Sequence, residues 1–316
     1  MPATVAECMG PRYPAPAPLV SGHAPHRAAA AAARFRQPLL PAGLDDPGRV
    51  ADLLAGPAGA GLGVAALQGR KVAGFLAPLT FDLWGQPAAY VPEWGQGAAD
   101  PGLVAGLYAA ASAGWVGAGR RLHAVTLWVG QPEVEAAWHA LGFGRVVVDA
   151  VRGLEASGRR PRKGGVRRAG PRDASTVTAL ERALWDHLAA APVCRVAAAP
   201  SGRAAVARRL ADPAQPVWLA EVAGAPAGFI SLQPGDDSPA ALRSPDLVRC
   251  DGALVLPGLR RKGVGTALLA AALQWAAAAG FTGCALDYES ANLPAASFWP
   301  AAGFTPVLHS VARRLA

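Results

Sequence analysis

Apolar residues recur at helix and strand spacings through the second half of the chain. Val177, Leu180, Leu184 and Leu188 follow every three or four residues, which predicts a helix with one buried face after Asp173, a candidate N-cap. Short apolar runs alternate with such helices, so the pattern predicts an α/β fold with an α+β mixed sheet. Strands are expected at 166–168, 217–222, 228–232, 253–256, 284–289 and from 304, and helices at 201–210, 266–279 and 293–302.

The two halves of the chain carry similar local sequences in the same order. Ala73-Gly74-Phe75-Leu76 recurs as Ala227-Gly228-Phe229-Ile230, Trp115 recurs as Trp275, and Trp138-x-x-x-Gly142-Phe143 recurs as Trp299-x-x-x-Gly303-Phe304. The spacing between the matching segments is nearly constant, which indicates two tandem copies of one domain. A copy of about 150 residues is an ordinary domain size.

A basic, Gly-interrupted segment separates the two copies. From Ala156 to Arg172 there are seven positive residues and no acidic one, and such a self-repelling run is typical of a linker. The expected organisation is a disordered Pro/Ala-rich tail over 1–33, a degenerate copy over 34–155, the linker over 156–166 and an intact copy over 167–316.

Composition narrows the class of protein. Of the 316 residues, 52% are apolar and 16% are charged, but alanine supplies much of the apolar share, and Gly, Pro or Arg interrupts every candidate membrane span. The first thirty residues lack the apolar core of a signal peptide, so we expect a cytoplasmic protein without membrane contact. Four widely spaced cysteines and six histidines show no paired ligand spacing, which disfavours a metal site.

The net charge of +8 has two interpretations. Only Lys71, Lys163 and Lys262 among the 30 basic residues are lysines, and an arginine excess beside so much Ala, Gly and Pro favours the codon bias of a GC-rich genome. The alternative is a nucleic-acid surface on the run Arg159–Arg172. We expect no nucleic-acid partner.

One turn in the second copy has the features of a phosphate-binding site. Arg260-Arg261-Lys262-Gly263-Val264-Gly265 lies between the strand 253–256 and the helix from Thr266. Alternate glycines let backbone N–H groups converge, and the helix start adds unpaired N–H groups and a positive dipole end. A Walker-type loop would need lysine at Val264, and a dinucleotide fingerprint would need glycine at Leu268. The turn therefore favours a diphosphate.

With this turn the second copy resembles the GNAT superfamily of N-acetyltransferases over the whole of 167–316. Val255-Leu256-Pro257 and Arg260-x-x-Gly263-x-Gly265 match its acetyl-CoA motif, and Asn292, Phe298-Trp299 and Gly303-Phe304 match its downstream signature. The resemblance implies an acyltransferase that passes an acetyl group from acetyl-CoA to a primary amine by direct attack in a ternary complex, without a metal. The implied coenzyme contacts are Ala253, Leu254 and Val255 along the pantetheine, Arg260, Arg261, Lys262, Gly263, Val264, Gly265 and Thr266 at the diphosphate, and Asn292 near the reaction centre.

The first copy departs from this motif. After its equivalent strand, 88–91, it has Pro92 to Asp100, which contains no basic residue and in which Glu93 and Asp100 would repel a diphosphate. Gln131 stands near the position of Asn292. We expect this copy to be a structural or substrate-shaping partner without its own coenzyme.

The catalytic side chains are left open by the sequence. Asp287 occupies the place of a carboxylate in related acetyltransferases and is one candidate base, and Asp251, at the head of the preceding strand, is the other. The family's usual tyrosine acid is Trp299 here, which cannot ionise usefully. Tyr288 is either a substitute acid or a packed strand residue, and water could protonate the leaving thiolate instead. His187 either lines the acceptor pocket or is a solvated helix-end histidine.

Two further questions stay open at this point. The chain could be a non-catalytic acyl-CoA-binding protein instead of an enzyme, because its acid is missing and its base is uncertain. The acceptor is a small-molecule or peptide amine, and the acids Asp236, Asp237 and Asp246 could attract a cationic one or could simply be solvated. The sequence does not set the oligomeric state.

Overall fold

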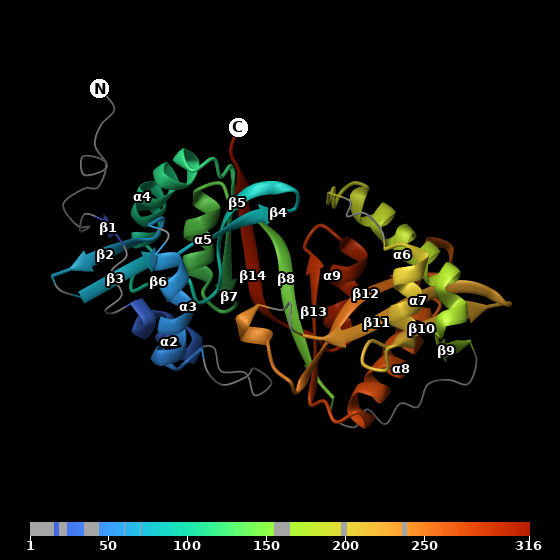
Figure 1. Cartoon of the computed structure of the whole chain (residues 1–316). Helices are drawn as coiled ribbons and strands as arrows, with labels where there is room; N and C mark the ends of the chain where they lie inside the picture. Colours follow the sequence, from blue (N-terminus) through green and yellow to red (C-terminus); the bar gives the residue numbers. More distant parts are fainter. Residues whose placement is uncertain are drawn as a thin grey trace. The chain divides into compact units, whose positions relative to one another are not determined.

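The computed structural model describes residues 16–18, 24–34, 44–59, 61–69, 71–154, 165–196, 201–235 and 239–316 (Figure 1). Most of the predicted linker, with Arg159, Arg160, Arg162 and Lys163, lies outside these residues, as do Asp236 and Asp237. The chain forms two units. Unit 1 comprises Met1–Val148, Pro239–Ala241 and Val307–Ala316, and unit 2 comprises Asp149–Ser238 and Leu242–Pro306.

Unit 2 alternates helices and strands as the sequence predicts. Its sheet has the strand order β13-β12-β11-β10-β9, in which β12 and β13 run parallel and the other neighbours are antiparallel. The elements are β9 (Val166–Arg168), η1 (Pro171–Asp173), α6 (Ala174–Ala189), α7 (Arg203–Ala211), β10 (Val217–Val222), β11 (Ala225–Pro234), β12 (Leu247–Val255), η3 (Pro257–Leu259), α8 (Val264–Ala278), β13 (Gly283–Glu289) and α9 (Leu293–Ala301).

Helices cover both faces of this sheet. Val177 and Leu180 of α6 and Val206 of α7 pack with Phe229 and Leu254 of the sheet in one buried cluster. Helix α8 contacts the same strands from the opposite face, because its Trp275 meets Trp218, which lies between Val217 and Leu219 of that cluster on β10. The turn between β10 and β11 uses positive φ angles at Ala223 and Gly224, as a two-residue hairpin turn requires.

Unit 1 is built in the same manner. Its strands are ordered β1-β2-β3-β6 and β4-β5-β7-β14, and its core gathers Tyr108, Trp115, Trp138, Phe143 and Val311. The elements are β1 (Pro16–Pro18), α2 (Ala24–Arg34), α3 (Pro47–Gly59), β2 (Val64–Gln68), β3 (Lys71–Leu76), β4 (Leu79–Leu83), β5 (Gln86–Val91), β6 (Gln96–Ala98), α4 (Leu103–Gly117), β7 (Leu122–Trp128), α5 (Pro132–Ala140) and β14 (Thr305–Arg314). Strand β8 (Gly144–Gly153) passes from unit 1 into unit 2 at Asp149.

Part of the segment expected to be a disordered tail is ordered. Strand β1 pairs with β2, and α2 buries Ala28 and Ala29 while the Nε of Arg27 donates a hydrogen bond to the carbonyl of Val72. The expectation is therefore wrong over these residues. Alanine has the highest helix propensity, and a run of it forms a helix once one face can be buried.

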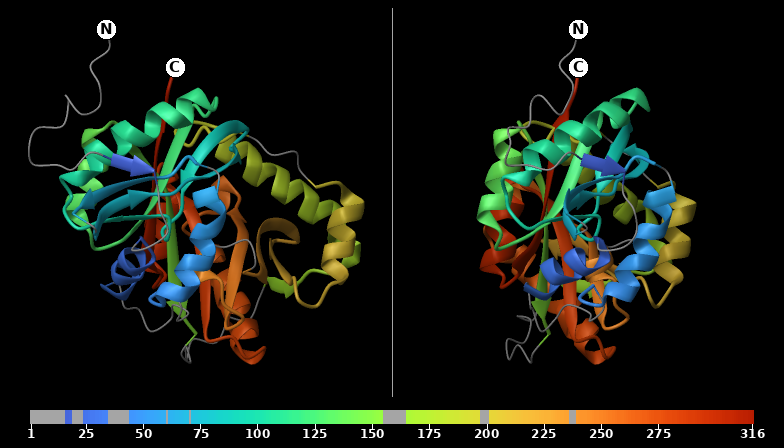
Figure 2. Two further views of the ribbon diagram at one scale, coloured as in Figure 1. Left: turned by 60° about the vertical axis from the view of Figure 1, so that its left-hand side comes forward. Right: turned by 90° about the vertical axis from the view of Figure 1, so that its left-hand side faces the viewer.

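The units exchange their last strands. The sequence places one boundary in the linker, but residues 307–316, at the end of the second copy, belong to unit 1, where β14 pairs with β7 from Leu308↔Trp128 to Arg314↔Leu122 (Figure 1 and Figure 2). Residues 149–153, at the end of the first copy, belong to unit 2. Unit 1 therefore contains the last strand of the second copy, and unit 2 contains the end of the last strand of the first copy.

Matching arginines fasten these exchanged strands. Arg313 of β14 donates from Nη1 to the carbonyl of Leu141, 2.8 Å away, at the end of α5. Arg152 of β8 makes the same bond to Ala302 at the end of α9, and both members of this second pair lie 161 residues from the first. A cation at a helix C-terminus satisfies carbonyls that lack an intrahelical partner. The equivalence supports the internal repeat.

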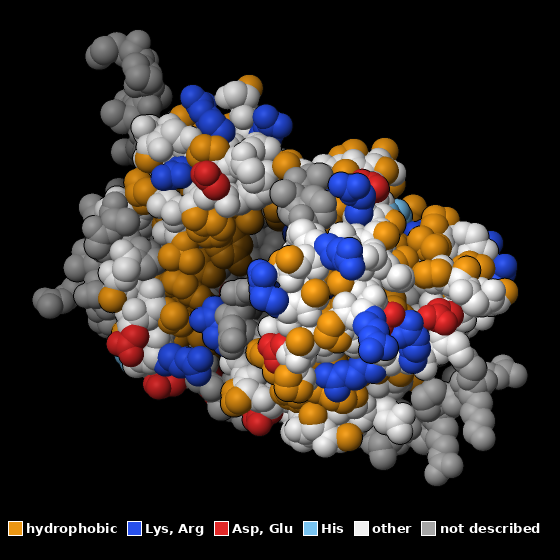
Figure 3. Space-filling model, turned by 45° about the vertical axis from the view of Figure 1, so that its right-hand side comes forward, with side chains coloured by type: hydrophobic (Ala, Val, Ile, Leu, Met, Phe, Trp, Pro, Cys, Tyr) orange, Lys and Arg blue, Asp and Glu red, His pale blue; other side chains and the backbone are white. Residues whose placement is uncertain are grey.

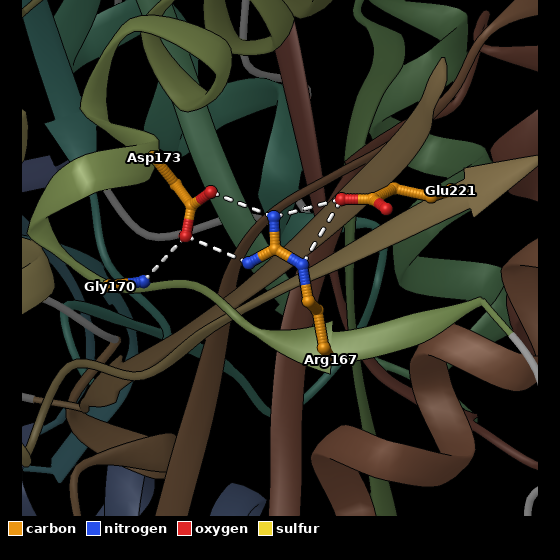
Figure 4. Close-up of polar contacts among 4 residues, drawn as sticks. All are labelled: Arg167, Gly170, Asp173 and Glu221. Carbon is orange, nitrogen blue, oxygen red and sulfur yellow. Dashed lines mark hydrogen bonds and ion pairs between the residues drawn. The ribbon is translucent and has the colours of Figure 1, made fainter. Parts of the chain in front are cut away.

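An ion cluster ties the first strand of unit 2 to its first helix (Figure 4). Both Nη atoms of Arg167 donate to the carboxylate of Asp173 at 2.9 and 2.8 Å, and Nη2 also donates to Glu221 at 2.8 Å. The N–H of Gly170 donates to the same Asp173 carboxylate. Asp173 is the N-cap residue of α6, as predicted, but its side chain binds these groups instead of capping the helix.

We expect Asp173→Asn to remove an acid-sensitive part of the stability. The hydrogen bonds from Arg167 lower the pKa of Asp173 to about 2. A lowered carboxyl pKa stabilises the fold above the unfolded value of about 3.9, and this contribution is lost as pH falls toward 2. Because Arg167 is half exposed, we expect a loss of about 1 kcal/mol at pH 6 that vanishes near pH 2.

Urea unfolding of the full chain between about pH 6 and pH 2 measures this difference. Asp186→Asn, at an exposed position on the same helix, is the control and should track the parent at every pH. A constant difference between Asp173→Asn and the parent across the range would contradict the assignment.

Candidate functional site

Strands β12 and β13 of unit 2 pair over a short distance and then separate. Their parallel register is Leu247↔Gly283, Val248↔Cys284 and Arg249↔Ala285, although β12 continues to Val255 and β13 to Glu289. A β-bulge in β12, opposite Ser231 and Leu232 of β11, makes Asp251 an extra residue where the pairing ends. A bulge re-aims a strand, so it directs β12 away from its neighbour.

The second half of β12 keeps its pairing with β11. The N–H of Leu256 bonds to the carbonyl of Ala227 at 2.9 Å, and the register continues with Leu254 opposite Phe229. In an antiparallel pair alternate residues bond across, so the N–H and C=O groups of Ala253 and Val255 point away from β11. The Nε of Arg260 donates to the Val255 carbonyl at 3.1 Å, which agrees with that direction. The N–H groups of both residues and the carbonyl of Ala253 are therefore directed toward the space that an extended ligand would take.

The turn after β12 exposes backbone N–H groups at the start of α8. Gly263, the N-cap residue, has φ +83°, and Arg261 has φ +58°, so both take the left-handed conformation. No side chain caps the helix, and its first N–H groups have no intrahelical acceptor. Gly265 packs closely, since a Cβ there would lie 3.4 Å from Phe298 and 3.6 Å from Val255. The turn forms an anion-binding surface with a positive dipole end.

A cavity of about 600 Å³ joins this turn to the separated strands. Strand residues 253–255 line it, as do all the motif residues from Arg260 to Thr266 except Lys262 and Val264. Asn292, the N-cap of α9, also lines it; its Oδ1 accepts the N–H of Ala295 at 3.4 Å, which leaves its Nδ2 as a donor. Nine of the eleven predicted coenzyme contacts, Asn292 among them, thus line one cavity, and Lys262 and Val264 are neighbours of lining residues in the turn.

A family model matches part of the second copy. The sequence of residues 182–304 matches the acetyltransferase (GNAT) family. This part of the chain is a GNAT domain. A search of curated protein sequences finds no match.

Solved structures extend the likeness to the whole chain. The GCN5-related N-acetyltransferase from Sphaerobacter thermophilus has 12% identity and a TM-score of 0.59, with 95% of each chain covered, so it shares the fold. A tandem GNAT protein from the clavulanic acid biosynthesis pathway has 18% identity and a TM-score of 0.48, with 95% of this chain and 98% of that chain covered. The predicted mixed α/β fold of two GNAT-like copies is confirmed.

The three predicted catalytic side chains lie outside the cavity of the GNAT domain. Asp287 accepts a hydrogen bond from Nη2 of Arg249, and Asp251 is exposed and accepts one from Gln233 at 2.9 Å. Tyr288 is buried. Strand alternation puts it on the face opposite Asp287, as the sequence predicts. Their catalytic roles stay predictions.

Helices α6 and α9 also line the cavity, and among their residues the sequence indicates His187, Phe298 and Trp299, but not Leu184 or Ser297, as site residues. Leu184 and His187 of α6 line the cavity, and so do Ser297, Phe298 and Trp299 of α9. The spacing of Leu184 and His187 placed both on one helix face, but only the packing of α6 on β11 and β12 brings that face to the cavity. Trp299 is buried between Phe298 and Phe304.

Unit 1 lacks the features that form the cavity in the GNAT domain. Its β5 pairs with β7 to its last residue, Val91, and the segment 92–100, in which the sequence predicted no coenzyme site, contains the short strand β6. Four residues then lead into α4. The carboxylate of Asp100 accepts the N–H of Gly102 at 2.8 Å, so the chain itself supplies the anion at this helix start. Glu93 is buried and instead accepts the N–H of Ala241.

A membrane span, a metal site and a nucleic-acid surface would each require particular features of the described residues. Among the described residues, no helix is long and apolar enough to span a membrane, and no three His, Cys, Asp or Glu side chains gather to hold a metal. Figure 3 shows basic side chains beside acidic ones on the face that it presents. Within the basic run, Arg167 binds Asp173 and Glu221, and Arg168 donates to the carbonyl of Pro213 and lies over Trp275. These two arginines are committed to internal contacts.

Proposed function

We propose that the GNAT domain binds acetyl-CoA in its cavity and transfers the acetyl group to a primary amine within a ternary complex. The observation that carries this proposal is the continuity of an unpaired strand edge with an anion-binding helix start. The diphosphate lies on the N–H groups of the turn around Gly263, and the pantetheine amides pair with Ala253 and Val255. The thioester then lies toward Gly252, where β12 leaves β13.

The strand edge and the groups around it can each contribute to the acetyl transfer. The strand edge fixes the acyl carbon, so that binding converts the reaction with the amine into an oriented, effectively unimolecular step. A backbone N–H that points into the gap, such as that of Val255 or Ala253, can stabilise the oxyanion that forms on the carbonyl. Asn292 offers its Nδ2 from the opposite wall of the cavity. No metal is required, and unit 1 has a structural or substrate-shaping role.

Calorimetry and thiol release on the full chain test the proposal. We expect one acetyl-CoA to bind per chain, because Asp100 occupies the helix start in unit 1 that would take a second. Thiol release from acetyl-CoA is then followed with a short unblocked peptide, spermidine, an aminoglycoside and a simple alkyl amine. Binding without release on any amine would support the alternative of a non-catalytic acyl-CoA-binding protein. No binding, or two molecules per chain, would contradict the assignment of the site.

A further inference from the structure

The cavity of the GNAT domain contains very few side chains that can exchange a proton. Of the residues that line it, His187, Arg260 and Arg261 carry ionisable groups. An arginine stays protonated at any pH at which the protein is folded, so it cannot act as a base. Among the described residues that line the cavity, His187 is therefore the one whose side chain can both accept and donate a proton.

His187 also lies on the acceptor side of the cavity. It is half-buried on α6, one helical turn after Leu184, and both side chains line the cavity. Leu184 packs close to the bulge of β12, where its Cδ2 would lie 3.6 Å from a Cβ on Gly252. The diphosphate end, by contrast, is formed by the turn and α8. The helix face with Leu184 and His187 thus covers the end of the cavity at which the proposed function puts the thioester.

We propose that His187 is the proton shuttle of the acetyl transfer, an inference that rests on the proposed function. The neutral amine attacks the thioester carbonyl, and a C–N bond forms. The imidazole of His187, directly or through one water, takes the proton that the nitrogen loses. The C–S bond then breaks, and the imidazolium returns that proton to the CoA thiolate, so that one proton has moved from nitrogen to sulfur and the products are the amide and free CoA.

His187 can supply the acid group that a tyrosine supplies in the family pattern. Trp299 stands where a phenolic acid is expected, and an indole N–H does not ionise usefully. A thiol titrates near pH 8.5 and an imidazole near pH 6.5, so an imidazolium can protonate a thiolate in a downhill step. One residue then serves as base for the amine and as acid for the leaving group.

The carboxylates of β12 and β13 have a different purpose. Asp287 is held by Arg249 of the neighbouring strand, outside the cavity. In unit 1 the corresponding pair is Tyr90 and Thr126, whose hydroxyls are 2.9 Å apart across β5 and β7. Both copies thus place a polar cross-strand pair here, although unit 1 lacks the phosphate turn. We assign this pair to holding the strands in register, not to catalysis.

Charged groups surround α6 on several sides. On the helix itself, Asp186 is exposed and Glu181 is paired with Arg209 of α7. On the strands beneath lie the pair Arg249–Asp287 and Asp251 with Gln233. After the helix, Arg195 pairs with Glu289 and stacks on Trp185. Arg260 and Arg261 lie across the cavity. The carboxylates with ion-pair partners are largely neutralised, and Arg260 and Arg261 add positive charge on the cavity side.

The test compares His187→Gln with the parent on the full chain. Acetyl-CoA binding is measured by calorimetry, and thiol release is measured with the same amine panel from about pH 5.5 to about pH 8.5. We expect coenzyme affinity to stay within about threefold, since His187 is away from the turn, and kcat/KM to fall about 100-fold at pH 7.5. The ratio of parent to variant kcat/KM cancels the titration of the amine itself, and it should fall as the pH drops and protonates the histidine.

Two further variants separate catalysis from structure. His139→Gln removes an exposed imidazole from unit 1 and should leave both rate and pH profile unchanged. His187→Ala should regain part of its rate, about tenfold, when free imidazole is added at high concentration.

Two outcomes would overturn the proton shuttle while the parent still turns over. One is a parent-to-His187→Gln ratio of kcat/KM that stays constant across pH, and the other is a His187→Ala variant whose rate free imidazole does not raise. Both would leave the proposed function intact. No thiol release by the parent with any amine would contradict the proposed function and, with it, the shuttle.

Discussion

We expect Gly263→Asp to abolish acetyl-CoA binding while the domain stays folded. Gly263 is the N-cap residue of α8, and no atom lies within 4 Å of the place a Cβ would take, so the side chain is accommodated without a clash. Aspartate tolerates the left-handed conformation better than most residues and is a favoured N-cap. Its carboxylate would lie at the N–H groups of the helix start, as the side chain of an N-cap aspartate does.

The same carboxylate repels the coenzyme. Two negative charges about 4 Å apart near a protein surface interact by roughly 4 kcal/mol, so affinity should fall by about 100-fold or more. Thermal stability should fall slightly, because the left-handed conformation at Gly263 (φ +83°) costs an aspartate about 1 kcal/mol. Calorimetry measures the first effect and thermal unfolding the second, and a variant that is stable but cannot bind acetyl-CoA is the expected result.

A matched substitution shows whether the loss of affinity depends on the position of the added negative charge. Gly258→Asp adds the same group to the same loop, at an exposed glycine with open space around it and outside the cavity. We expect its acetyl-CoA affinity to fall by no more than about threefold, through long-range repulsion alone. Equal losses in the two variants would show that the turn around Gly263 does not hold the diphosphate.

The phosphate turn could be predicted from sequence because local chemistry determines it. Gly263 and Gly265, the cations beside them and the strand–turn–helix order lie within about a dozen residues, and all of them follow from backbone conformation and charge. The repeat also gave the fold of both copies. Residues far apart in sequence gave less: Asp287 and Arg249 meet through the register of β12 against β13, and periodicity carries no information on register.

The strand exchange could not have been predicted, for a related reason. Strands β8 and β14 end with equivalent residues, down to the arginines that cap α5 and α9. The sheets of the two copies therefore present similar edges to similar strands, and the sequence pattern fits either assignment equally well. The choice depends on the tertiary path of the chain, which local propensity does not determine.

We expect removal of the last ten residues to unfold unit 1, although those residues belong to the second copy by sequence. A chain that ends at Pro306 loses the part of β14 that pairs with β7, including Val307, Leu308 and Val311, which are fully buried. The edge of β7 would be left unpaired, and the core around Trp138 would be open on one side. Within unit 2, the strands β9 to β13 are untouched.

A point variant tests the same strand with less disruption. Val311→Asp buries a carboxylate in the core of unit 1 and should cost about 3 to 5 kcal/mol, whereas Arg314→Asp, at an exposed position on the same strand, should cost less than about 0.5 kcal/mol. Amide hydrogen exchange followed by peptide mass spectrometry locates the effect. Faster exchange in α4 and β7, with α8 and β10 still protected, is the expected result.

The location of the effect distinguishes the two possible assignments of β14. If β14 completed the sheet of its own copy, as the domain bounds expected from sequence imply, both the truncation and Val311→Asp would loosen β10 to β13 and leave α4 and β7 protected. Coenzyme binding would then fall with them, since the turn and the separated strands belong to that unit. In the exchanged arrangement the same changes remove the core of unit 1 while the cavity keeps all its lining residues, so acetyl-CoA binding to the truncated chain should persist.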